Sequence, residues 1–335
     1  MATLAVTNPT LADVAKATDP DGKIATIVEI LNETNEMLDD MVWVEGNLPT
    51  GHRTTVRAGL PSPTWRKLYG GVQPTKATNV QVTDTTGMLE AYAEIDKALA
   101  DLNGNTAAFR MTEDKAHIEG MSQEFMNTVI YGNEGTAPEE FTGLAPRFND
   151  NSGPANADNI LLGGGSGSDN SSIWLVSWGN DTVHGIYPKG SKAGLQFSDK
   201  GQVTLEDASD GSNSGRMEAY RSHYKWDCGI SVRDWRYIVR IFNIDNSDLK
   251  ADKSSSSADL TDLMAQAIEL LPNASKGRPA FYMNRTLRST LRRQIANTTN
   301  VNLTMDQVGG KHVMSFDGIP VRRCDALTST EATIS

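Results

Sequence analysis

The feature that most constrains the fold is a stretch, residues 42–86, that cannot bury a hydrophobic core of its own. It contains the run NLPTGHRTTVRAGLPSPTWRKLYGGVQPTKATNVQVTD, which is rich in Pro, Gly and Thr and poor in large apolar residues. Alternating pieces such as TTVRA and NVQVT favour β-strands, so we predict a long, twisted hairpin. An isolated hairpin buries too little apolar area to offset the conformational entropy lost on folding. The segment is therefore either flexible or held by a neighbour.

A tryptophan lies inside this hairpin, in the run SPTWRKLYGG. Most of the other tryptophans fall in strand-rich sequence farther along the chain, where burial in a core is expected. Trp65 has no such core beside it, so it is either half-exposed or buried on something outside the hairpin. Because tryptophan anchors are typical of interfaces, we favour contact with another subunit. The candidate contact residues of the hairpin are Trp65, Arg66, Lys67 and Tyr69.

A long helix is predicted from about Thr106 to Tyr131. Its apolar residues recur at helical spacing and form one face, and the face on the other side of the helix is charged. This apolar stripe consists of Met111, Ile118, Met121, Phe125 and Val129. At about 1.5 Å per residue the helix would be about 38 Å long, which is long for a small domain.

A shorter helix is predicted just before the long one. Apolar residues recur from Leu89 to Leu102, and the pair Asn103–Gly104 is a favourable C-cap.

At the start of the chain, residues 1–22 have no sustained hydrophobic period and are predicted to form an arm that is ordered only if something else holds it. A helical stripe between Ile24 and Met41 follows this arm.

After Asn149 the sequence becomes rich in loops and strands. The strongest predicted strands are SIWLVSW, TVHGIYP, AYRSHYKWDCGISV and RYIVRIFNI. One helix should begin within SSSSADLTDLMAQAIELL, with Asp259 or Ser257 as its N-cap, and NRTLRSTLRRQIAN should form another. The run HVMSFDGIPVRRCDAL predicts two strands around a turn at Asp317–Gly318. Together these elements place the chain in the α+β class.

The glycine-rich run GGGSGSDNSS, residues 163–172, has to be tested as a phosphate-binding loop. Such loops need the GxxxxGK[ST] or the GxGxxG spacing, followed by a helix whose N-terminus holds the phosphate. Neither spacing occurs here, and the residues that follow predict a strand. We interpret the run as a connector between packed segments.

The net charge of −11 argues against a protein that binds nucleic acid tightly, since such proteins carry a basic face. The charge is uneven, because residues 275–325 contain nine Lys or Arg and three Asp, which gives +6 and leaves −17 for the remainder. Opposite charges on one chain suit attraction between its copies, although solvated faces are the more common cause.

Three arginines of that basic segment, Arg285, Arg288 and Arg292, would share one face of a helix. Such a face is most often solvated or salt-bridged within its own chain. The alternatives are contact with an acidic neighbouring subunit and, after that, phosphate binding. We keep these arginines as candidate subunit contacts.

No catalytic, cofactor-binding or metal-binding residues are predicted. The five histidines are dispersed, and no HExxH, CxxC or GxSxG pattern occurs. The two cysteines, Cys228 and Cys324, are expected to be buried structural thiols. We also expect neither a signal peptide nor a membrane span. A soluble hydrolase that uses Asp and His side chains of the strand-rich part is the alternative from a different class.

The order of these parts resembles the major capsid proteins of tailed double-stranded DNA bacteriophages, which share the Hong Kong 97 capsid fold. The similarity runs over nearly the whole chain, and its most specific runs are IWLVSWG, GIYPKG and HYKWDCGISVRDWR. The stretches GMLEAYAEIDKALADLNGN and FRMTEDKAHIEGMSQEFMNTVIYGN add to it. These runs look like the branch of the family found in epsilon15-like short-tailed phages.

The resemblance implies a division of the chain into four parts. They are an N-terminal arm and helix over residues 1–41, an extended loop over 42–86, a peripheral domain over 87–150 plus 311–335 with a spine helix at about 106–131, and an axial domain over 151–310.

The resemblance also implies a structural function without enzymatic activity or cofactor. Copies of the chain would form the hexamers and pentamers of an icosahedral head in the virion, assembled in the host bacterial cytoplasm. The head would enclose double-stranded DNA without sequence-specific binding, and its other partners would be a scaffold, a portal and a cement or decoration protein, with no membrane involved. The alternative within this fold is an encapsulin-like cage around protein cargo.

Some relatives join a loop lysine covalently to an asparagine of a neighbour. Lys67 and Lys76 lie in the matching loop here, but the sequence identifies no partner for them.

Overall fold

The computed structural model describes residues 33, 35–102, 106–153, 155–207, 215–250, 258–296, 303–308 and 311–334. The chain divides into two compact units, which we describe separately. Unit 1 is made of Met1–Glu33, Met88–Phe125 and Gly194–Asp227, and unit 2 of Thr34–Gly87, Met126–Ala193 and Cys228–Ser335. The predicted arm and the first part of the helical stripe after it lie outside the described residues.

Unit 2 is built around β6 (Asn170–Trp178), a strand whose residues are all buried. It pairs antiparallel with β10 (Ile238–Asp245) and with β11 (Arg278–Met283), so it has a neighbour along each edge. A strand covered on both faces is expected to be continuously apolar, which explains the run SIWLVSW. Beyond β11 the sheet continues through β14 (Ile319–Arg323), β13 (Lys311–Phe316) and β12 (Leu303–Val308).

Shorter elements complete unit 2. Three short strands join the sheet, namely β5 (Ile160–Leu162) beside β10, β7 (Val183–Tyr187) beside β6, and β1 (Trp43–Glu45) beside β7. The remaining turns of helix are α2 (Met37–Asp40), η1 (Ala145–Arg147), η2 (Ala155–Asn159) and η3 (Trp235–Tyr237).

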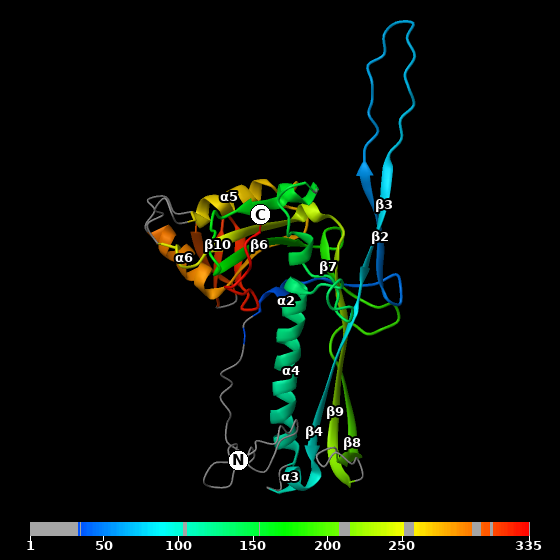
Figure 1. Ribbon diagram of the computed structural model, residues 1–335, viewed down its shortest axis with the longest axis vertical. Helices are drawn as coiled ribbons and strands as arrows, with labels where there is room; N and C mark the ends of the chain where they lie inside the picture. Colours follow the sequence, from blue (N-terminus) through cyan, green and yellow to red (C-terminus); the bar gives the residue numbers. More distant parts are fainter. Residues whose placement is uncertain are drawn as a thin grey trace. The chain divides into compact units, whose positions relative to one another are not determined.

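Two helices, α5 (Leu260–Glu269) and α6 (Arg285–Ala296), pack on this sheet through their apolar faces (Figure 1). Their leucines contact the buried residues of β6 and β10 in one continuous core. Asp259 caps α5, because its side chain accepts hydrogen bonds from the backbone N–H groups of Thr261 and Asp262. The sequence therefore identified the start of this helix correctly.

Two local predictions about turns and connectors are confirmed. Asp317 and Gly318 join β13 to β14 with left-handed φ values of 48° and 78°, as a two-residue hairpin turn requires. The glycine-rich run joins β5 to β6, and no helix follows it. A Cβ atom on Gly165 would lie 2.7 Å from the carbonyl oxygen of Asn243, so the close approach of the run to β10 requires glycine there.

The predicted hairpin is present as a separate two-stranded sheet (Figure 1). β2 (Gly51–Gly59) pairs antiparallel with β3 (Thr78–Thr85), with Gly51 opposite Thr85 and Gly59 opposite Thr78. Residues 60–77, which connect the two strands, form no further strand or helix.

Unit 1 combines one long helix with three strands. The helix α4 (Thr106–Tyr131) has the bounds that the sequence predicts, and its last residues belong to unit 2. The strands are β4 (Gly87–Asp96), β8 (Gln196–Asp207) and β9 (Gly215–Val232). β9 pairs with β8 and neighbours β4, and Trp226 of β9 stacks on Phe125 of α4 with 4.4 Å between ring centroids.

The prediction of a helix over Leu89–Leu102 is wrong for most of its length. The first part is the strand β4, and only Lys97–Asp101 forms a short helix, α3. Burial alternates along β4, and Ala93 and Ile95 are its buried residues. The same apolar residues fit a period of two, and pairing with β9 selects the strand over the helical propensity of the segment.

The predicted apolar stripe of α4 is confirmed only in its C-terminal half. Met121, Phe125 and Val129 are buried, whereas Met111 and Ile118 are 61% and 41% exposed. Phe109 is buried instead, in a small core with Ile95 and Ala100. The two halves of the helix therefore bury different faces, because each half packs on different neighbours.

The expected peripheral and axial domains remain predictions, and the strand pairing groups their residues differently. β13 and β14, from the residues expected in the peripheral domain, pair into the sheet that contains β6 and β11. β8 and most of β9, from the residues expected in the axial domain, belong with α4 in unit 1.

Candidate assembly surfaces

The loop at the end of the hairpin exposes large apolar side chains. Trp65 and Tyr69 are fully exposed, and Leu68 is nearly so. We call the exposed side chains of this loop the apolar tip, which consists of Leu60, Trp65, Leu68, Tyr69 and Val72. Fully burying a large apolar side chain is worth about 1.5–3 kcal/mol, so the tip offers association energy that the single chain does not use.

Three of the candidate contact residues shape the turn that carries these aromatic rings. Arg66 Nε donates a hydrogen bond of 2.9 Å to the carbonyl of Gly70, and the N–H of Gly70 donates to the carbonyl of Lys67 at 3.1 Å. Tyr69 has a φ of 64°, a left-handed value that costs a non-glycine residue about 1 kcal/mol. The loop is thus ordered by local contacts although no core supports it.

The base of the hairpin, in contrast, is anchored to unit 2. Asp84 of β3 is buried, and its carboxylate accepts hydrogen bonds from Arg147 Nη2 at 2.8 Å and from Ser231 Oγ at 2.7 Å. Arg147 also donates to the carbonyls of Gly143 and Thr142. This network ties the hairpin to η1 and to the end of β9.

Two histidines lie beside this anchor. The ring of His184 is 1% exposed and meets the ring of His52 edge-on, with 5.7 Å between centroids. Burial, followed by the nearby charge of His52, lowers the pKa of His184 to about 4, although the backbone of Gly179 favours its protonated form. Burial and Arg233 also lower the pKa of His52. The ring of His184 is therefore neutral at pH 7.

The candidate arginines of α6 belong to a larger group, which we call the arginine cluster. It consists of Arg285, Arg288 and Arg292 of α6 and Arg322 and Arg323 of β14. Arg285 and Arg323 both bind the carboxylate of Asp325, each with a shortest distance of 2.7 Å. The interpretation of this face as partly salt-bridged within its own chain is thus correct for Arg285.

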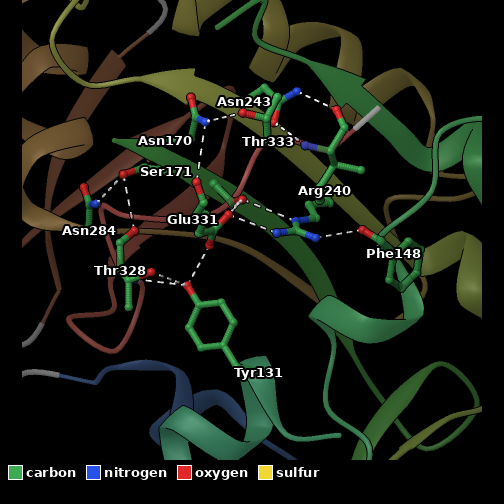
Figure 2. A network of polar contacts seen from close by, with 12 residues as sticks. Tyr131, Phe148, Asn170, Ser171, Arg240, Asn243, Asn284, Thr328, Glu331 and Thr333 are labelled. Carbon is green, nitrogen blue, oxygen red and sulfur yellow. Dashed lines mark hydrogen bonds and ion pairs between the residues drawn. The ribbon is translucent and has the colours of Figure 1, made fainter. Parts of the chain in front are cut away.

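A buried polar network, which the sequence did not reveal, joins the C-terminal segment to β10 and α4 (Figure 2). Arg240 Nη2 lies 2.9 Å from Glu331 Oε2, and both side chains are almost fully buried. Tyr131 donates a hydrogen bond of 2.6 Å to Glu331 Oε1, and burial together with Glu331 raises the pKa of Tyr131 well above its usual value. Arg240, which lies between apolar residues in the run IVRIF, was the signal that could have predicted a buried ion pair.

The same network holds the backbone of the C-terminal segment. The side-chain amide of Asn243 donates to the carbonyl of Ile334 at 2.8 Å and accepts from the N–H of Ile334 at 3.1 Å. Arg240 also donates to the carbonyl of Phe148 at 2.8 Å, and its guanidinium lies 4.9 Å from the ring centroid of Trp174. This polar network stabilises the fold, and its charged groups, Arg240 and Glu331, pair with each other.

The described residues show no cluster of three or more His, Cys, Asp or Glu side chains that could hold a metal ion. Cys228 and Cys324 are both buried and form no disulfide, as expected for structural thiols. Among the described helices, none combines the length and apolar character needed to cross a membrane.

Comparison with known families decides the class of the protein. The family model for the major capsid protein GP7 matches residues 19–335. The chain belongs to this capsid protein family. It is a structural shell protein of a bacteriophage capsid, so the shell function, the family and the α+β Hong Kong 97-like fold predicted from the sequence are confirmed.

A solved capsid structure with 41% sequence identity agrees with this assignment to the capsid family. A chain in the cryo-electron-microscopy structure of bacteriophage epsilon15 is 41% identical, with a TM-score of 0.79, and the match covers 100% of this chain and 99% of that chain. A chain of the bacteriophage JBD30 capsid is 9% identical, with a TM-score of 0.48 and coverages of 89% and 92%. The SrpI encapsulin of Synechococcus elongatus is 9% identical, with a TM-score of 0.45 and coverages of 71% and 96%. No curated protein matches the sequence.

Proposed function

We propose that this capsid protein forms the hexamers and pentamers of an icosahedral head that encloses double-stranded DNA, and that it assembles in the host bacterial cytoplasm. The observation that carries the proposal is the apolar tip, a group of fully or largely exposed aromatic and aliphatic side chains on a hairpin without a core. Such a loop gains stability when it lies on a neighbouring copy, and many such contacts add up to a strong assembly.

The contacts between copies would use the hairpin and the arginine cluster. We assign this role to Trp65, Arg66, Lys67 and Tyr69 of the hairpin and to Arg285, Arg288 and Arg292 of α6. The hairpin tip and α6 are different surfaces, as contacts in a ring require, since each copy must present one surface to the next copy and another to the previous one.

The acidic chain also suits a shell around DNA. A net charge of −11 disfavours tight binding of a polyanion. Packaged DNA can therefore enter and leave without strong electrostatic binding to the inner surface of the shell. A scaffold, a portal and a cement or decoration protein are the further partners we propose, on the basis of the family.

The test is a shortened hairpin. Replacing Pro61–Lys76 by Asn-Gly closes β2 and β3 with a two-residue turn and removes most of the apolar tip. We expect a folded chain, with an unchanged circular dichroism spectrum, that forms no shells under conditions in which the unaltered chain does, as seen by electron microscopy and sedimentation. Shells of normal size from the shortened chain would contradict the proposal. Protein rather than nucleic acid inside purified particles would favour a cage around protein cargo instead.

A further inference from the structure

The arginine cluster contains a guanidinium that forms no ion pair with a described residue. Arg288 lies half-buried on α6, between Arg285 and Arg292 on the same helical face. In the parts of the chain that the structure describes, its guanidinium has no hydrogen bond and no ion pair. Burial and the charges of Arg292, Arg323 and Arg322 lower the pKa of Arg288, while Glu36 opposes this effect.

The carboxylates that contact the arginine cluster already have other partners. Asp325 is shared by Arg285 and Arg323. Asp40 accepts hydrogen bonds from Arg322 at 3.1 Å and from Tyr282 at 2.7 Å. Glu36 is 3.5 Å from Arg322, whose Nε is buried without a hydrogen-bond partner among the described residues. Within the described residues, the cluster therefore lacks an acceptor for Arg288 and for part of Arg322.

An ordered acidic loop of the same chain has an excess of negative charge. Residues 133–140 follow α4 with the sequence NEGTAPEE, and we call them the acidic loop. Asn133 orders this loop, because its carbonyl accepts the N–H groups of Thr136 and Ala137 and its side chain accepts that of Gly135. Glu139 is exposed and Glu140 partly exposed, and neither carboxylate has a cationic partner among the described residues.

We propose that Arg288 and Arg322 bind the acidic loop, through Glu139 and Glu140, of a second copy of the chain. The inference rests on the proposed assembly and names one contact within it. Carboxylates are the natural partners of guanidinium groups, since two parallel hydrogen bonds can form between them. In the described part of one chain, the acidic loop and the cluster share no ion pair, so the contact has to come from another copy.

Nucleic acid is a less suitable occupant of the cluster. Glu36, Asp40 and Asp325 are interspersed among the arginines and would repel a continuous phosphate backbone. The rest of the chain is strongly acidic, which favours a protein partner with a few localised carboxylates over a polyanion.

The experiment reverses the charges one side at a time and then together, in the full chain. The variants are Arg288→Glu, the loop variant Glu139→Arg, and the combination of the two, in which Arg322 and Glu140 keep their charges. Arg293→Glu is the matched control, because Arg293 is an exposed arginine of the same helix, one position away from the face of Arg288 and Arg292. Assembly is followed by sedimentation and electron microscopy, and folding of the unassembled chain by circular dichroism and thermal unfolding.

We expect Arg288→Glu and the loop variant each to raise the chain concentration needed for half-maximal assembly by about tenfold or more, with the control unchanged. The combined variant should recover most of the lost assembly, since the charges are complementary again. Normal assembly of both single-side variants would overturn the inference while leaving the proposed shell function intact. Failure of the combined variant to recover, with all chains folded, would also overturn it. Binding of a short DNA duplex that Arg288→Glu abolishes would show that the cluster is a phosphate site instead.

Discussion

The carboxylate of Asp84 and the guanidinium of Arg147 form an ion pair of 2.8 Å at the base of the hairpin, with the Asp84 side chain almost fully buried. A buried carboxylate is stable only when it is paired and hydrogen-bonded, and Ser231 provides a further hydrogen bond at 2.7 Å. The hairpin is therefore rigidly attached at one end and exposes its apolar tip at the other. This combination suits a structure that is completed by its neighbours.

Asp84→Ala should detach the hairpin base. The substitution leaves Arg147 without its carboxylate partner, so we expect the free energy of unfolding to fall by about 3 kcal/mol. Urea unfolding of the unassembled chain measures this effect. Glu134→Ala, which removes a carboxylate in an exposed hydrogen bond to Thr85, is the control and should change stability by less than about 0.5 kcal/mol. Equal effects of the two substitutions would argue against the anchor.

Trp65→Ala should weaken assembly without changing the stability of the unassembled chain. Because Trp65 is fully exposed in the single chain, its removal should change the stability of the unassembled chain by less than about 0.5 kcal/mol. In the shell, the same change should cost about 2 kcal/mol or more at each contact, as for interface anchors. Thermal unfolding and particle yield are measured side by side. A parallel loss of both would mean that Trp65 serves the fold of its own chain.

Glu331→Gln should destabilise the fold by leaving Arg240 charged and buried without a counter-charge. Breaking such a pair typically costs about 3–5 kcal/mol, whereas replacing both partners by apolar residues is often neutral. We therefore expect the double variant Arg240→Met with Glu331→Leu to regain much of the lost stability in chemical unfolding. If the double variant is as unstable as Glu331→Gln, the hydrogen bonds to Tyr131 and Ser172, not the ion pair, dominate this region.

Acid should weaken the hairpin base through His184. The pKa of His184 is about 4 in the folded chain and about 6.5 when exposed, so the unfolded chain binds the proton more readily. Stability should therefore fall as the pH drops from about 6.5 towards 4, by up to about 3 kcal/mol for this group. The charged groups around it are His52 and Arg233, which lower its pKa, and Asp84, which raises it.

The variant His184→Phe removes this titration and isolates its contribution. Between pH 7 and pH 4.5 the unfolding free energy of His184→Phe should decline less steeply than that of the unaltered chain. His117→Gln, a change at a partly exposed position of α4, should leave the slope as it was. Identical slopes for His184→Phe and the unaltered chain would show that other groups cause the acid sensitivity.

Several local features of this protein follow from the sequence alone. The bounds of α4, the buried strand β6, the hairpin, the Asp259 cap and the Asp317–Gly318 turn were all predictable from residues that are close together in the chain. In each case the decisive interaction is short-range: a helical or alternating period, a side chain that caps its own helix, or a residue that tolerates a left-handed φ.

Only the tertiary structure decided how these pieces are used. The apolar residues of β4 fit a strand and a helix almost equally well, and the neighbouring strand β9 made the choice. Arg240 and Glu331 are far apart in the sequence, so no local pattern could show that they form a buried pair, or that Arg288 forms no ion pair with a described residue. Local periodicity is set by the backbone itself, whereas burial and charge pairing depend on which distant faces meet.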